Sequence, residues 1–113
     1  MGGGPGRGVG RSGVTAGTGV AWNRGQLEAG LDHKIEAVHA AAQKALAQLE
    51  FATISDKQGS HEAQLVARTA LDKKVEITLQ RVTDRSTKVI IRVGAFGDET
   101  LSMSIWDKIK ADL

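Results

Sequence analysis

The sequence predicts one small α+β domain, an antiparallel sheet of four to five strands with two helices packed on one face, in the order β-α-β-β-β-β-α. Two segments show the three- and four-residue apolar spacing of helices, and the segment between them shows the two-residue alternation of strands. Of the 113 residues, 41% are hydrophobic and only 4% are aromatic, so we expect a single core of aliphatic side chains.

Glycine content divides the chain into two parts. Nine of the 14 glycines lie between residues 2 and 19, where few apolar side chains could offset the entropy lost on ordering. We therefore expect residues 1–18 to be a flexible arm or a remnant of engineering, and residues 19–113 to form the domain. Residues 20–29 are predicted to be one extended segment, broken or bulged at Gly25.

Residues 33–50 are predicted to form the first helix, with Asp32 as its N-cap. The expected apolar stripe is Ile35, Val38, Ala42, Ala45, Leu46 and Leu49. The polar residues predicted on the opposite side are Lys34, His39, Gln43, Lys44 and Gln48.

Four strands are predicted next, at residues 51–57, 61–69, 74–82 and 87–93, joined by links of hairpin length. Alternation in the last three puts these residues on a buried face: Ala63, Leu65, Ala67, Val75, Ile77, Leu79, Val89, Ile91 and Val93. The other face is expected to be wet and to carry Gln64, Arg68, Glu76, Thr78, Gln80, Lys88 and Arg92, together with the apolar Val66 and Ile90.

The last helix is predicted to open at Asp98 and Glu99 and to close at Lys108 and Lys110, since these charges complement the helix dipole. Its apolar stripe is Leu101, Ile105, Ile109 and Leu113, with Trp106 at the edge. The preceding Gly94-Ala95-Phe96-Gly97 is interpreted as a tight turn whose Phe96 plugs the end of the core. Anion binding by its backbone NH groups is the alternative, opposed by the two acids that follow.

The sequence offers no candidate catalytic, cofactor-binding or metal-ligating residue. Gly8-Val9-Gly10-Arg11-Ser12-Gly13 matches G-x-G-x-x-G, but neither a strand before it nor a helix after it is predicted, so we read the match as chance. His33 and His39 fall on different sides of the predicted helix, and cysteine is absent. The hypothesis that follows is a protein that is not an enzyme and needs no cofactor.

The patterns of charge and hydropathy indicate which classes of partner are not expected. The formal net charge is +2 and the basic residues form no continuous stripe, so no nucleic-acid partner is expected. No window reaches the ~20 apolar residues of a membrane span, and the first residues lack the apolar region of a secretory signal. We expect the chain as given to be soluble.

Several runs resemble a family of small bacterial predicted lipoproteins whose domain has no assigned function. The similarity covers residues 13–113 and is carried by Gly13-Val14-Thr15-Ala16-Gly17-Thr18-Gly19, Gly25-Gln26-Leu27, Ala41-Ala42, Ala45-Leu46 and above all Ile91-Arg92-Val93-Gly94-Ala95-Phe96-Gly97-Asp98-Glu99. Members begin with a signal peptide and a lipid-bearing cysteine, which this chain lacks. The resemblance implies a periplasmic or outer-membrane-associated natural protein, attached to the membrane only through a lipid anchor.

The leading functional hypothesis is a cell-envelope interaction module that meets another envelope protein, or a second copy of itself, through its sheet face or an edge strand. A small-molecule carrier is the main alternative, with a pocket between helices and sheet lined by Leu46, Leu65, Ile77 and Ile105. An enzyme built from dispersed polar residues such as His61 and Asp84 is the weaker third reading.

Overall fold

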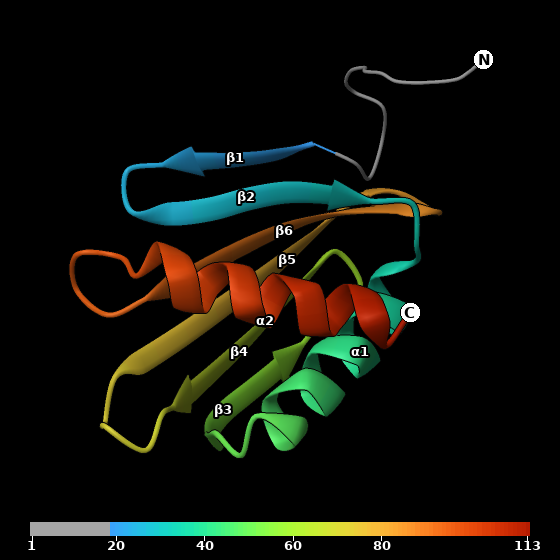
Figure 1. Cartoon of the computed structure of the whole chain (residues 1–113). Coiled ribbons are helices and arrows are strands. Elements are labelled where there is room, and N and C mark those ends of the chain that lie inside the picture. The colour runs from blue at the N-terminus through green and yellow to red at the C-terminus, as the bar shows by residue number, and fades with distance from the viewer. Residues whose placement is uncertain (1–18) are drawn as a thin grey trace.

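A computed structural model of the chain describes residues 19–113 (Figure 1). Its elements are β1 (Val20–Asn23), β2 (Gln26–Leu31), α1 (Ile35–Gln48), β3 (Ala52–Gln58), β4 (Glu62–Arg68), β5 (Lys74–Thr83), β6 (Ser86–Val93) and α2 (Glu99–Ala111). The strands form one six-stranded antiparallel sheet in the order β1-β2-β6-β5-β4-β3. Both helices lie on the same side of this sheet, as Figure 1 shows.

The predicted α+β class and the two helices on an antiparallel sheet are confirmed, but the sheet has six strands instead of four to five. The extra strand arises because residues 20–29 fold as a hairpin. Arg24 and Gly25 have φ angles of 54° and 82°, and positive φ at both central residues is the signature of a type I′ turn. The chain therefore reverses at Gly25 and is not a single bulged strand.

The predicted core face of the sheet is confirmed. All nine residues assigned to it in β4, β5 and β6 are at most 2% exposed. They pack with apolar side chains of β2 and of both helices in one cluster. Since each helix contributes its own apolar side, the sheet is sealed on that side only.

Helix α1 is shorter than predicted, and Asp32 is not its N-cap. The N-cap is Lys34, which makes no side-chain capping bond. The reason is that β2 continues to Leu31, which pairs with Thr87, so Asp32 and His33 are needed to bend the chain over the sheet. The Thr87 hydroxyl donates to the His33 carbonyl at 2.8 Å and fixes this bend.

Helix α2 confirms its predicted cap and corrects its predicted edge. Asp98 accepts a hydrogen bond from the Leu101 amide at 2.9 Å, and Glu99 follows in the first turn. Trp106, predicted at the edge of the stripe, is only 1% exposed. It is the largest of the fully buried side chains among the described residues. Because α2 contacts α1 as well as β2 and β6, it buries a wider arc than one apolar stripe.

Phe96 does not plug the core, as the sequence suggested, since its side chain is 95% exposed. The loop before α2 turns at Gly94 and Gly97, whose φ angles are 74° and 87°. A Cβ atom on Gly97 would overlap the backbone of Gly25 in the β1–β2 turn. This backbone-to-backbone packing fixes the loop, and the Phe96 side chain lies in solvent.

Candidate functional site

The face of the sheet turned away from the helices is not covered by any helix or strand of the described residues. Its central row runs across four strands from Glu28 through Ile90 and Thr78 to Gln64. The residues predicted for this wet face are half-buried or exposed, and Val66 and Ile90 do lie among them. We call this surface the bare face.

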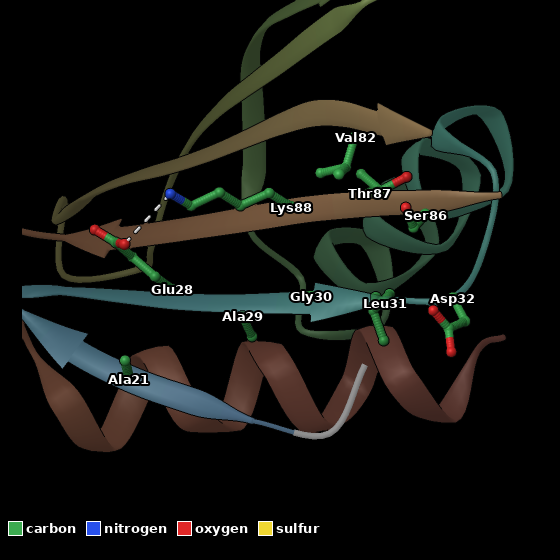
Figure 2. A pocket seen from close by; sticks show the side chains of 10 residues that line it. All are labelled: Ala21, Glu28, Ala29, Gly30, Leu31, Asp32, Val82, Ser86, Thr87 and Lys88. Carbon is green, nitrogen blue, oxygen red and sulfur yellow. Dashed lines mark ion pairs between the residues drawn. The ribbon is translucent and has the colours of Figure 1, made fainter. Parts of the chain in front are cut away.

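A groove with a volume of ≈ 430 Å³ lies at one end of the bare face (Figure 2). Gly30 of β2 has no side chain, and the neighbouring Ala21 of β1 has a short one, so the surface is hollowed there. Val82 of β5, 63% exposed, stands at its margin. The full lining is Ala21, Glu28, Ala29, Gly30, Leu31, Asp32, Val82, Ser86, Thr87 and Lys88.

An ion pair closes one end of this groove. The Lys88 ammonium lies 3.5 Å from Oε1 of Glu28 (Figure 2). Gln26 donates to Oε2 of Glu28 at 2.8 Å, and this hydrogen bond is the largest influence that lowers the pKa of Glu28; burial opposes it, and Asn23 and Lys88 add to it. Glu28 is therefore held as a carboxylate whose charge is paired with that of Lys88.

A second groove, with a volume of ≈ 700 Å³, lies at the opposite end of the bare face beside Phe96. Its lining is Arg68, Asp72, Lys73, Lys74, Glu76, Arg92, Gly94, Ala95 and Phe96. Arg92 braces it, since its guanidinium donates to the Ala95 carbonyl at 2.6 Å and to the Arg24 carbonyl at 3.2 Å. The loop that presents Phe96 is thus tied to both β6 and the β1–β2 turn.

The described residues also contain a polar cluster, in which only His39 is buried, that the sequence did not predict. His39, expected on the polar side of α1, is 5% exposed, and its Nε2 lies 2.7 Å from Oδ1 of Asp56 in β3. Gln43 donates to Oδ2 of the same carboxylate at 2.6 Å. Burial raises the pKa of Asp56, but the hydrogen bonds from His39 and Gln43 outweigh it and hold the pKa below its usual value.

This cluster has a structural role that its position explains. Helix α1 lies over the edge of the sheet at β3, so its His39 side meets Asp56 instead of water. The signal that could have found it is the alternation of β3, which turns Asp56 to the helix side with its partner Leu65. With a His, an Asp and a Gln bonded to one another, the cluster fastens α1 to the edge strand.

The other residues singled out from the sequence are not gathered into a site. The Gly8–Gly13 motif lies outside the described residues. His61 and Asp84 lie in exposed turns, and both bond to Arg81, whose amide donates to the His61 carbonyl at 2.9 Å and whose guanidinium pairs with Asp84. Within residues 19–113, no three His, Cys, Asp or Glu side chains lie close enough to hold a metal ion.

The pocket expected for a small-molecule carrier is occupied by the core itself. Leu46, Leu65, Ile77 and Ile105 are at most 1% exposed and belong to the core cluster. None of them lines either groove of the bare face. This packing favours the hypothesis of an interaction surface over that of a small-molecule carrier, because these four side chains are packed within the core.

The fold and these surfaces define an α+β domain with a helix-covered sheet face and a bare one. The chain belongs to the family described as "Protein of unknown function (DUF3568)", whose family model matches residues 9–112. A comparison with curated proteins finds no match. Neither described helix is long and apolar enough to cross a membrane.

Proposed function

We propose that this protein is a binding module of the bacterial cell envelope and that the bare face is where it meets another envelope protein. The observation that carries the proposal is that the helices cover only one of the two sheet faces. Both helices seal one face, whereas the other presents two grooves with exposed apolar side chains at either end, Val82 and Phe96.

The presentation of Phe96 supports a binding role. Leaving a phenylalanine side chain in water forgoes about 2 kcal/mol relative to burying it. The loop that carries Phe96 is nevertheless rigid, because Gly97 packs on Gly25 and Arg92 bonds to Ala95. A large side chain held outward by a fixed backbone loses little entropy on binding, and aromatic anchors of this kind dominate many interfaces.

The polar residues of the bare face suit a partner that is itself half polar. Glu28 and Lys88 pair with each other, and Lys74 lies 3.6 Å from Glu76. Charges matched in this way can be covered by a protein surface at lower cost than isolated charges. The face therefore fits a non-obligate protein interface, in which polar and apolar area are mixed.

A pair of photo-reactive side chains tests the binding face. One variant carries the cross-linker at Thr78, in the central row of the bare face; its matched control carries it at Lys108, exposed on α2. In cells of the natural host we expect a discrete cross-linked protein from Thr78, lost when Phe96→Ser is added, and none from Lys108. Equal cross-linking from both positions would overturn the proposal.

The envelope assignment rests on the resemblance of residues 13–113 to lipoproteins and needs its own test. We expect the natural gene product to sediment with the membrane fraction and to show a lipid-modified N-terminal cysteine by mass spectrometry. Recovery of the whole protein in the cytosolic fraction without lipid would refute this part and leave the binding face untouched.

A further inference from the structure

We infer that a second copy of this chain adds to the sheet at β1, joining two six-stranded sheets through their edges. Strand β1 ends the sheet, and within residues 19–113 no strand pairs with its outer side. An open edge presents unpaired backbone NH and CO groups to any strand that can match them. This inference goes beyond the proposed function, because it concerns the edge and not the bare face.

The two edges of the sheet differ in how they are protected. The outer strand β3 carries a register shift between Thr53 and Ser55, has Asp56 and Lys57 along it, and is fastened under α1 by His39. A bulge and charged side chains are the usual devices that keep an edge from pairing. The described edge at β1 has neither: its first three residues, Val20, Ala21 and Trp22, are uncharged and in regular register with β2.

The backbone of β1 fixes which residues are free to pair. In a hairpin with a two-residue turn the pair beside the turn, here Asn23 and Gln26, is hydrogen-bonded, and such pairs alternate along the ladder. Ala21 therefore bonds toward β2. Val20 and Trp22 point their backbone groups outward, and their side chains, 43% and 39% exposed, lie on the helix side beside Ala29 and Leu27.

A second copy matches these groups when the two β1 strands run antiparallel about a twofold axis at Ala21. Val20 of each copy then exchanges backbone hydrogen bonds with Trp22 of the other, so every outward residue of β1 is used. The same register stacks valine on tryptophan twice, which is a favourable cross-strand pair, and places no charge against a like charge. No other register pairs both Val20 and Trp22 within β1.

The joined sheet would also join the binding surfaces. A twofold axis perpendicular to the sheet keeps the helices of both copies on one side and both bare faces on the other. Ala21 lines the groove at Gly30, so the two grooves would meet at the Ala21 pair. The dimer would present one continuous bare face.

Charge at Ala21 tests both the contact and its register. For the wild-type full chain, sedimentation velocity over rising concentration should show the mass moving from one chain toward two. Ala21→Glu alone and Ala21→Lys alone should each stay monomeric, because like charges would face each other across the axis. An equal mixture of the two variants should recover the dimer.

Controls separate this contact from misfolding and from the bare face. Circular dichroism must show both Ala21 variants folded, and Ala52→Glu on the opposite edge strand should dimerise as the wild type does. Phe96→Ser should also leave the dimer intact, so the two proposals can fail independently. A wild type that stays monomeric at every concentration, or a mixture that fails to recover the dimer while both variants are folded, would overturn the inference.

Discussion

Gly97 shows at the scale of one residue how the domain holds Phe96, its most exposed large hydrophobic residue, in place. Its φ of 87° is one that side chains rarely adopt, and a Cβ there would overlap Gly25. Gly94 has a similar φ of 74° but no atom near its missing Cβ. A substitution at Gly94 would therefore cause backbone strain alone, whereas a substitution at Gly97 would cause both backbone strain and a steric overlap.

Alanine substitutions at these glycines should have unequal effects. Gly94→Ala should lower the free energy of unfolding by roughly 1 kcal/mol, the cost of a left-handed alanine. Gly97→Ala should cost at least about 2 kcal/mol more, since the loop must also move off the β1–β2 turn. Urea denaturation measures both, and equal losses would show that the Gly25–Gly97 contact is not tight.

Asp56 predicts a dependence of stability on pH. Its pKa is lowered in the folded state, so its contribution is complete above the pKa of an unfolded aspartate and disappears as the pH falls through the lower folded pKa. Asp56→Ala should therefore destabilise the protein by about 1 to 2 kcal/mol at neutral pH and by much less in acid. A loss that is the same at neutral and acid pH would contradict this account.

Asp84 provides the control for that experiment. It pairs with Arg81, but its side chain is 85% exposed, and such surface pairs contribute little to stability. Asp84→Ala should change the unfolding free energy by less than about 0.5 kcal/mol at either pH.

At the scale of elements, the end of α1 carries a correctable strain. Glu50 follows the helix with a φ of 61°, a left-handed position usually taken by glycine. The amide of Phe51 donates to the Leu46 carbonyl at 3.0 Å, so the geometry belongs to the helix end itself. Replacing this residue should then stabilise the fold only if the replacement lacks a Cβ.

Glu50→Gly should raise the free energy of unfolding by about 1 kcal/mol, and Glu50→Ala, which keeps the Cβ, should not. Thermal unfolding of the two variants decides the matter. If alanine stabilises as much as glycine, the charge of Glu50 and not its backbone is the source of strain.

The same scale shows what the sequence could predict. Two-residue alternation identified every apolar core position of β4, β5 and β6, because a sheet with one covered face imposes that period on its residues; it did not identify the buried Thr87. The β1–β2 hairpin was not predicted, because its turn places Arg24, and not a glycine or asparagine, at the first left-handed position. Local patterns find elements, but they miss a turn whose residues are atypical.

At the scale of the whole molecule, the errors share one cause. The sequence misplaced His39, Trp106 and Phe96 because their burial depends on what lies across from them in the fold. His39 meets Asp56 of β3 and Trp106 is buried in the core, whereas Phe96 is exposed on a loop where Gly97 packs on Gly25. The periodicity of one element shows which face a residue takes, but it does not show which residue of another element lies opposite.

The bare face is likewise a property of the whole molecule, since it exists only because both helices cover the other side. Covalent footprinting with hydroxyl radicals tests most directly that a partner covers it. In the purified full chain Phe96 should be oxidised strongly, together with Leu71 and Ile54, which are exposed elsewhere. In cells of the natural host, Phe96 should be protected while Leu71 and Ile54 stay reactive. Phe96 oxidised in cells as strongly as in the purified chain would contradict the account.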